Sequence, residues 1–246
     1  MKKQIANFFN KGSKHYSKEA IIQKYVAKKC ISKIEGKYFP YILEIGAGGN
    51  ILTSLIQRQI KTKVLVAIDI SSQMLSYCTN GIKIIADGEY APFKPNSFDL
   101  VLSSSAMQWY NFAPASIQNN ISLVKTGGQY SFAFFIKGTL KELETISKET
   151  QFGSIFHLQT QEKYLKFFKN KKIKFNYEIE TKKIYFPSVK DILKHLQKTG
   201  TNYTTNKYRY GKEKYKNFCK LYTKKYSKNN SVFITYKILY IWGYKE

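Results

Sequence analysis

The amino-acid sequence predicts an α/β fold built on a mostly parallel sheet, and two observations indicate it. Downstream of residue 40, short apolar runs alternate with segments of helical pattern, as in the βαβ units of parallel sheets. The first run leads straight into Gly46-Ala47-Gly48-Gly49, a composition typical of the turn between a first strand and its helix. With 246 residues, the chain has room for one such domain with an appended lid.

Seven segments have the composition of strands. Each is a short apolar or alternating run bounded by turn residues. In chain order they are 41–45, 64–68, 82–86, 98–103, 129–136, 173–186 and 232–242. We expect the last of them to be an antiparallel strand at the edge of the sheet, because it is rich in β-branched and aromatic residues.

Helices are expected around this sheet. Apolar residues recur at helical spacing between Ile21 and Ile34, so the stretch up to about residue 36 is predicted to be an amphipathic helix that acts as a lid or a covering layer. The segments 140–148 and 161–168 also have helical patterns. A further helix is predicted to begin after Pro187, with Ser188 as its N-cap and Asp191 as the capping-box partner.

These assignments give one domain that spans residues 1–246. Within it we expect a helical lid at 1–39, a sheet core at 40–186 and 231–246, and a polar, Lys- and Tyr-rich helical insertion at 187–230. Hydrophobic residues make up 43% of the chain and charged residues 23%, which is a normal composition for a folded core.

The sequence indicates a cytoplasmic protein. It has no apolar run near the roughly 20 residues that a membrane span requires, and its N-terminus lacks a signal-peptide core. Cys30, Cys78 and Cys219 are isolated and odd in number, so they indicate neither a disulfide framework nor a metal site. We expect them to be small buried or half-buried side chains.

The formal net charge of +25 has two possible origins. Arg58 and Arg209 are the only arginines, whereas lysines occur throughout. Dispersed lysines suit drift in an AT-rich genome, because specific base contacts and bidentate phosphate clamps favour arginine. The alternative is a basic face for an acidic partner, either a nucleic acid or an acidic carrier protein. Charge alone leaves both origins open.

The strongest local motif is the strand 41–45 with the glycine turn that follows it. Glycines at 46 and 48 let backbone approach a nucleotide-like ligand closely, because a side chain there would collide with it. An ordinary tight turn is the alternative. Ile51 replaces the third glycine of a dinucleotide fingerprint, so no pyrophosphate is expected. Glu44, at the end of the strand, suits a positively charged ammonium group.

Acidic residues also end the next two strands. Asp69 follows the strand 64–68, where a carboxylate can accept hydrogen bonds from both hydroxyls of a ribose. A helix N-cap is the alternative role for Asp69. Asp87 follows the strand 82–86, where it could accept an adenine amino group while Gly88 and the backbone address the ring. Residues 103–109 follow the fourth strand, at the edge where open α/β sheets bind ligands.

In this order and spacing, the motifs between residues 42 and 135 closely resemble motifs I to V of the class I S-adenosylmethionine-dependent methyltransferases. The resemblance implies a Rossmann-like sheet of seven strands, mostly parallel with the last strand antiparallel. It also implies S-adenosylmethionine as the methyl donor, lying across the ends of the first four strands. The expected donor site consists of residues at or beside these motifs. They are Glu44, Gly46, Ala47, Gly48, Asp69, Ile70, Met74, Asp87, Gly88 and Ser103.

A narrower resemblance extends over nearly the whole chain. It rests on the segments 9–20, 103–109, 138–143, 186–193 and 198–202, on His157, and on Thr235-Tyr236. Together these residues resemble the malonyl-acyl-carrier-protein O-methyltransferases of biotin synthesis. The Gln108-Trp109 pair and the Gly-Thr-Leu-x-Glu-Leu segment at 138–143 are unusual outside that family.

The chain departs from this family at three places. Ser103-Ser104 stands where the family usually has Ser-Asn, and Asn50 stands in place of the third glycine of motif I. Ser122 begins the segment where the family usually has an arginine. The loss of that arginine leaves open what would anchor a substrate carboxylate.

The narrower resemblance implies transfer of the sulfonium methyl group to the free carboxylate of a malonyl thioester, carried by acyl carrier protein or coenzyme A. A carboxylate is ionised at pH 7, so alignment and partial desolvation can supply the catalysis without a general base. Tyr16 is expected to close over the donor and His157 to donate to the substrate, with Gln108 and Trp109 lining the acceptor pocket. Packing is the alternative for Tyr16 and Trp109, and a surface or capping role for His157.

Two other functions stay open. Another class I methyltransferase could act on RNA or on a quinone precursor, but no amide-activating Asn-Pro-Pro-Tyr motif or RNA-binding module is visible, so nucleic acid is not the expected partner. A noncatalytic scaffold could use the same fold, but the intact acidic residues and glycines argue against it. A carrier-protein partner would contact lysines around the pocket mouth. The lysines expected there are Lys183, Lys190, Lys194 and Lys198.

Overall fold

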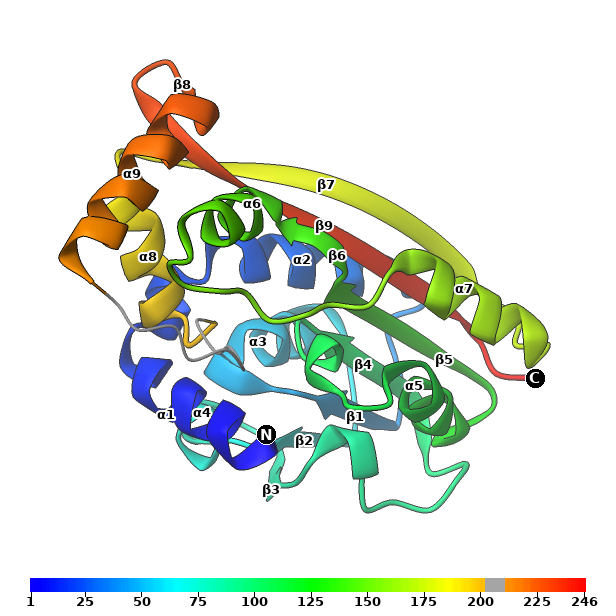
Figure 1. The fold of residues 1–246 in the computed structure, drawn as a ribbon. Coiled ribbons are helices and arrows are strands. Elements are labelled where there is room, and N and C mark those ends of the chain that lie inside the picture. The colour runs from blue at the N-terminus through cyan, green and yellow to red at the C-terminus, as the bar shows by residue number, and fades with distance from the viewer. Residues whose placement is uncertain (202–210) are drawn as a thin grey trace.

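A central β-sheet runs through the middle of the protein, and the computed structural model describes residues 1–201 and 211–246 (Figure 1). Seven strands lie side by side in the order β3-β2-β1-β4-β5-β9-β7. Their bounds are β1 (Tyr41–Ile45), β2 (Val64–Asp69), β3 (Ile82–Ile85), β4 (Phe98–Ser104), β5 (Val124–Phe135), β7 (Asn176–Phe186) and β9 (Ser231–Tyr244). The short strand β8 (Ser227–Lys228) pairs with β9, and β6 (Lys137–Leu140) follows β5.

The strand directions confirm the predicted fold class. The strands from β3 to β5 are parallel to their neighbours, and the last long strand, β9, is antiparallel to both β5 and β7. Its expected position at the edge is wrong, because β9 lies between β5 and β7. Most side chains of β9 are buried on both faces of the sheet. The edge strand beside β9 is β7, whose half-exposed side chains include Glu178, Glu180 and Lys182. Charges of this kind protect a sheet edge from pairing.

The helices follow the expected segments with one difference. Their bounds are α1 (Lys2–Glu19), α2 (Ile21–Ile31), α3 (Ile51–Gln59), α4 (Ser72–Ser76), α5 (Ala113–Ser122), α6 (Lys141–Thr150), α7 (Gln161–Asn170), α8 (Val189–Lys198) and α9 (Lys212–Tyr226). The single N-terminal helix of the prediction is two helices, because Ala20 adopts a non-helical conformation with φ −75° and ψ 55°. Residues 202–210, which include Arg209 and the end of the 198–202 segment, lie outside the described residues.

The predicted cap of α8 is present. The Ser188 hydroxyl accepts a hydrogen bond from the Asp191 amide and donates to the Asp191 carboxylate at 2.7 Å. This pair fixes where the chain leaves β7 and enters α8, so that the buried face of the helix, with Val189, Ile192 and Leu196, joins the core.

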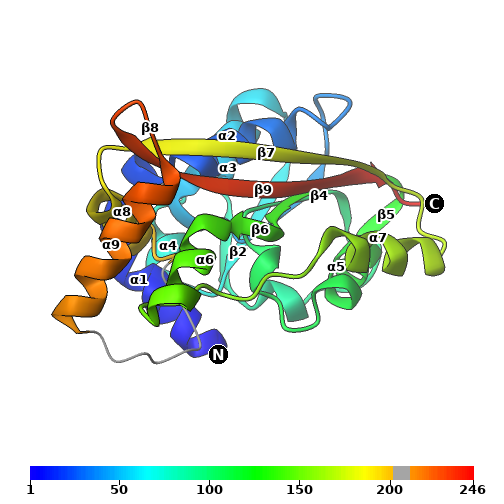
Figure 2. The same cartoon turned by 45° about the horizontal axis from the view of Figure 1, so that its top comes forward.

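Two hydrophobic cores lie on the two faces of the sheet. One contains α2 and α3 together with residues of α6, α8 and α9, and the other contains α5 and α7. Figure 2 shows α2 and α3 on one side of the sheet and α5 on the other. In both views α1, α8 and α9 lie together at one end of the molecule.

The first helix packs closely against the end of α8. A Cβ atom on Gly12 would lie 2.8 Å from the Gly200 nitrogen and 2.9 Å from the Lys198 carbonyl oxygen. The Lys198 ammonium also pairs with Glu19 at 2.7 Å. The N-terminal segment is therefore held as a covering layer over this end of the sheet.

Cys30 and Cys78 are buried and Cys219 is half-buried, as the sequence predicts. None of the described helices has the length and apolar character of a membrane span.

Candidate active site

A cavity of about 800 Å³, its open mouth included, lies at the carboxyl ends of the parallel strands. Loops after β1, β2, β3 and β4 form its floor, and α1 forms its cover. It is lined by residues of these loops and helices. The lining includes Lys2, Phe9, Tyr16, Gln23, Glu44, Gly46, Gly48, Asp69, Ile70, Met74, Asp87, Gly88, Ser104, Ser105, Ala106, Trp109 and Tyr110.

The glycine turn after β1 is shaped by left-handed backbone at three positions. Gly46 has φ 74°, Gly49 has φ 72° and Asn50 has φ 60°. Asparagine tolerates this conformation better than most residues, so the replacement of the third family glycine by Asn50 keeps the turn. A Cβ on Gly49 would lie only 2.5 Å from the Tyr16 ring. The missing side chain at Gly49 therefore lets Tyr16 of α1 pack directly on the turn.

Gly48 is required for a different reason. A Cβ there would lie 2.9 Å from Cε of Met74 and 3.0 Å from Oδ2 of Asp69. Space, and not an unusual backbone angle, therefore excludes a side chain at Gly48.

Asp69 ends β2, and both oxygens of its carboxylate accept hydrogen bonds from backbone amides. Its Oδ2 accepts a hydrogen bond from the Gly48 amide at 2.9 Å, and its Oδ1 accepts one from the Ser71 amide at 2.8 Å. Burial raises the pKa of Asp69 to about 6, so the carboxylate is mostly ionised at pH 7. The structure thus presents a fixed acceptor beside the glycine turn.

Glu44, near the end of β1, is only 1% exposed. Its Oε2 has no hydrogen-bond partner within the described part of the chain. Burial raises the pKa of Glu44 to about 8. A buried carboxyl group with a free oxygen on a cavity wall suits a cationic ligand group, which would replace the lost hydration of the carboxylate.

Asp87 follows β3 and receives a contact that the sequence did not predict. The Lys2 ammonium, at the start of α1, lies 3.1 Å from Asp87 Oδ1 and 2.9 Å from Glu89 Oε2. Backbone amides of Asn111 and Phe112 also donate to Glu89. Asp87 and Glu89 therefore hold the first turn of α1 at the rim of the cavity.

Two residues of the expected donor site lie outside this lining. Side chains alternate along β4, so the Ser103 hydroxyl points away from the cavity and donates to the Ile45 carbonyl at 2.8 Å. Ser104 and Ser105 take its place on the wall, and neither of their buried hydroxyls has a partner among the described residues. Ala47 packs in a small cluster with Ala67 and other buried residues.

A second cavity, of about 1260 Å³ with its mouth, adjoins the first. Gln23 and Trp109 line both cavities. The Trp109 ring packs against Phe9 at 5.8 Å and Phe156 at 4.9 Å between ring centroids. Gln108 lines the second cavity, and its amide donates to the Ser105 carbonyl at 2.7 Å. The connection between α6 and α7 contributes Phe152, Ile155 and Leu158 to the remaining wall, and β5, α6, α8 and α9 contribute further apolar side chains.

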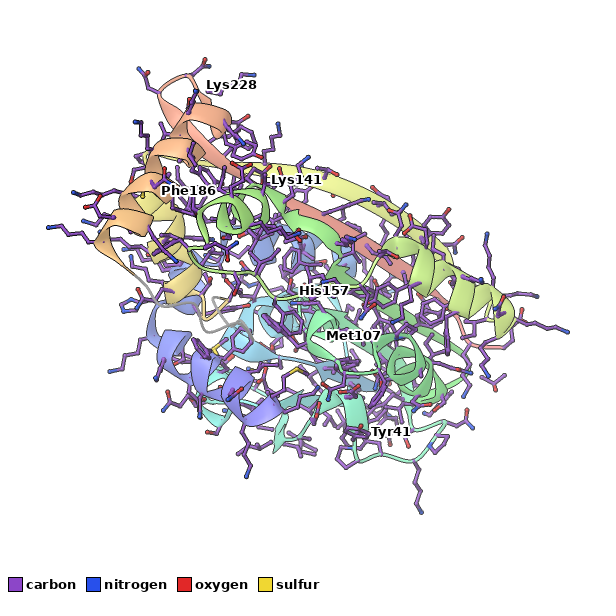
Figure 3. The ribbon with its side chains drawn as sticks, in the orientation of Figure 1. Tyr41, Met107, Lys141, His157, Phe186 and Lys228 are labelled. Atoms are coloured by element: carbon purple, nitrogen blue, oxygen red, sulfur yellow. The ribbon has the colours of Figure 1, made fainter. Side chains whose placement is uncertain are left out.

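His157 is not brought to this junction. It is exposed on the connection between α6 and α7, where Figure 3 labels it, and it lines a third cavity that continues from the second. Lys137 and Lys148 line the same outer cavity. The structure thus separates His157 from the donor cavity, and a loop residue of this kind gives no periodic signal that predicts its position.

Ser122, at the position of the family arginine, also lies away from the site. Its carbonyl accepts a hydrogen bond from the Lys245 ammonium at 2.9 Å, and it lines none of the three cavities. Its identity therefore has no direct effect on an acceptor in the second cavity.

Comparison with known proteins agrees with this geometry. Residues 43–132 match the model of a methyltransferase domain family. A malonyl-[acyl-carrier protein] O-methyltransferase of Calditerrivibrio nitroreducens is 29% identical over 95% of this chain and 93% of its own length. One of the same name from Bacteroides thetaiotaomicron is 24% identical over 98% of this chain and 97% of its own.

Solved structures show the same fold. The YcgJ protein of Bacillus subtilis has a TM-score of 0.61 at 12% identity and covers 90% of this chain and 98% of its own. Phosphoethanolamine N-methyltransferase 2 of Haemonchus contortus, solved with S-adenosyl-L-methionine, has a TM-score of 0.54 at 17% identity and covers 89% of this chain and 52% of its own.

The fold, the acids at the strand ends and these similarities define a class I S-adenosylmethionine-dependent methyltransferase. Within that class the chain is a relative of the malonyl-[acyl-carrier protein] O-methyltransferases.

The cavity fits S-adenosylmethionine, the methyl donor of this class. Glu44 offers an unpartnered carboxylate oxygen for the ammonium group, and Asp69 stands beside Gly48, where an added Cβ would intrude. The hydroxyls of Ser104 and Ser105 supply further unpaired polar atoms on the wall, within the described residues. These are the groups that would hold the donor.

We predict that Asp69→Ala weakens binding of S-adenosylmethionine by about 1.5–3 kcal/mol, the usual loss when hydrogen bonds to a charged acceptor disappear. Calorimetric titration measures this loss. Asp99→Ala is the matched control, because Asp99 also accepts a backbone hydrogen bond, from Tyr41, but lines none of the cavities. Equal donor affinity in the two variants would remove Asp69 from the site.

We predict that donor binding at pH 7 releases protons from Glu44. With a pKa of about 8 in the free protein, Glu44 is mostly protonated, and a bound ammonium group favours its ionised form. Titrations in buffers of different ionisation enthalpy should show net proton release by the wild type and none by Glu44→Gln.

The same substitution should stabilise the donor-free protein. A carboxyl pKa raised above its unfolded value gives stability that is fully present at low pH and lost as pH rises through the folded pKa. Glu44→Gln removes this loss, so at pH 8 its free energy of unfolding should exceed that of the wild type by about 1–3 kcal/mol. A Glu44→Gln protein that is less stable than the wild type at pH 8 would contradict the expected stabilisation. Normal donor binding by the same variant would contradict the role of Glu44 in the donor site.

Proposed function

We propose that this protein transfers a methyl group from S-adenosylmethionine to the free carboxylate of a malonyl thioester on acyl carrier protein, in the cytoplasm. The observation that carries the proposal is the junction of two cavities through Gln23 and Trp109. One cavity has the acids expected of a donor site, and the other is a mostly apolar space next to it. Relatives that match nearly the whole chain bear the name of this activity.

The proposed chemistry needs few groups from the protein. When bound, S-adenosylmethionine supplies an electrophilic sulfonium methyl, and the carboxylate oxygen gains that carbon as the carbon–sulfur bond breaks and its electron pair stays on sulfur. A carboxylate is already ionised at neutral pH, so no side chain has to remove a proton. Alignment of the acceptor and exclusion of water are the tasks left to the residues of the site.

Particular residues suit these tasks. Glu44, Asp69 and Asp87 would hold the donor, because all three line the first cavity. Tyr16, packed on Gly49 and 7% exposed, would close the cavity from above. Trp109 would separate bulk water from the junction. His157 faces the outer cavity, so we assign it no contact with the reacting carboxylate.

The surface of α8 suits an acidic carrier. Leu193, Leu196 and Gln197 of this helix line the second cavity, and Lys190 and Lys194 are exposed on the same helix. Two other lysines expected at the mouth have partners. Lys198 pairs with Glu19, and Lys183 lies 4.2 Å over the Phe233 ring. Lys190 and Lys194 are therefore the residues best placed to attract a carrier protein.

Transfer of labelled methyl groups tests the proposed function. The purified protein should methylate malonyl carrier protein and should leave acetyl carrier protein and bulk RNA unlabelled, because neither presents the free malonyl carboxylate. Labelling of RNA without labelling of malonyl carrier protein would overturn the proposal. Donor binding with no transfer to any of them would favour a noncatalytic scaffold.

We predict that kcat/KM for malonyl carrier protein falls steeply with rising salt, whereas kcat/KM for a malonyl thioester on a small carrier falls much less. Encounter between opposite charges is screened over about 8 Å at physiological ionic strength. The double variant Lys190→Glu and Lys194→Glu should reproduce the loss at low salt and keep donor affinity. The same salt slope for both substrates would show that these lysines are ordinary solvated surface.

A further inference from the structure

A buried glutamine stands at the junction of the donor and acceptor cavities. Gln23 lies on α2, is 4% exposed and lines both cavities. Its Oε1 is buried without a hydrogen-bond partner in the described residues. A rotation about the last side-chain bond exchanges the amide oxygen and nitrogen within the same shape, so either can face the junction.

A side chain of this kind destabilises the free protein. A buried acceptor without a hydrogen-bond partner is less favourable than an apolar group of the same shape. The neighbouring residues of α2 that face the core, Val26, Ala27 and Cys30, are small or apolar and fully buried. The amide at Gln23 therefore interrupts an apolar helix face at the one place where that face meets both cavities.

Any hydrogen bond that the second cavity donates to an anion comes from a neutral group of its described lining. Among its described lining residues there is no lysine, arginine or histidine. Gln108, which also lines it, uses its amide to hold the Ser105 carbonyl. The cations of this region, Lys137 and Lys148, line the outer cavity.

A neutral donor suits the reaction better than a cation. Methyl transfer to a carboxylate removes its negative charge, so an ammonium or guanidinium partner would stabilise the substrate more than the transition state. An amide N–H can orient the carboxylate and loses less interaction energy as the charge disappears.

We propose that Gln23 binds the carboxylate of the acceptor at the junction of the two cavities and selects acceptors that carry this group. The proposal rests on the proposed function, because it assumes a malonyl acceptor.

The test measures binding without turnover. S-adenosylhomocysteine fills the donor site, and calorimetry then gives the Kd of malonyl-pantetheine. The comparison ligand is 3-methylbutyryl-pantetheine, which replaces the carboxylate by an uncharged group of the same shape. Gln23→Met keeps the length of the side chain and removes its hydrogen bonds. It should weaken malonyl-pantetheine about 10- to 100-fold, the range expected for a hydrogen bond to a charged group, and leave 3-methylbutyryl-pantetheine within about twofold.

Gln59→Met is the matched control, because Gln59 is exposed at the end of α3 and lines none of the three cavities. It should leave both ligands unchanged. Gln23→Asn, a shorter amide, should fall between the wild type and Gln23→Met. Equal weakening of both pantetheine ligands would mean that Gln23 contacts the shared thioester, and a loss of S-adenosylhomocysteine affinity instead would place its amide on the donor. Either result overturns the proposal.

The wild-type protein separates this failure from failure of the proposed function. If the wild type does not prefer malonyl-pantetheine to 3-methylbutyryl-pantetheine, the malonyl acceptor itself is wrong. If the wild type shows the preference and Gln23→Met retains it, the function stands and the role of Gln23 is wrong.

Discussion

The donor site depends on one pair of hydrogen bonds, those that Asp69 accepts from the Gly48 and Ser71 amides. The first bond fixes the glycine turn after β1, and the second fixes the start of α4, where the Ser71 hydroxyl caps the helix by accepting from the Met74 amide. The same Ser71 hydroxyl donates to Asn10 of α1. One carboxylate at the end of β2 therefore links two strands, a helix and the covering segment that carries Tyr16.

The site keeps several groups that lower the stability of the free protein. Glu44 is a buried carboxyl group with an unpartnered oxygen, and Ser105 has a left-handed backbone with φ 59° in the described structure. Such costs are expected where a ligand completes the hydrogen bonds. These groups lie along the carboxyl edge of the sheet, whereas the two cores on its faces are apolar and well packed. This contrast distinguishes the functional part of the chain from its scaffold.

Sequence patterns predict this scaffold well because they are local. Apolar runs and glycines predicted the positions of β1 to β4 and of the acids at the ends of β1 to β3. The features that the sequence did not predict depend on side-chain direction and on contacts between distant segments. Side chains alternate along β4, so Ser103 points away from the cavity and Ser104 lines its wall, and a non-helical Ala20 separates α1 from α2. Lys2 and Gln23 reach the cavity only because α1 and α2 fold over it, so no local motif marks them.

Under the proposed function, the basic composition has a specific role on α8, where exposed lysines stand beside the second cavity. The central claim, that these cavities join S-adenosylmethionine to a malonyl carboxylate, is most directly tested by growth without biotin in a bacterial strain that lacks its malonyl carrier-protein methyltransferase. The account predicts that the wild-type gene restores growth and that a gene encoding Asp69→Ala restores it poorly. No growth with the wild-type gene, despite soluble expression and measured donor binding, would contradict it.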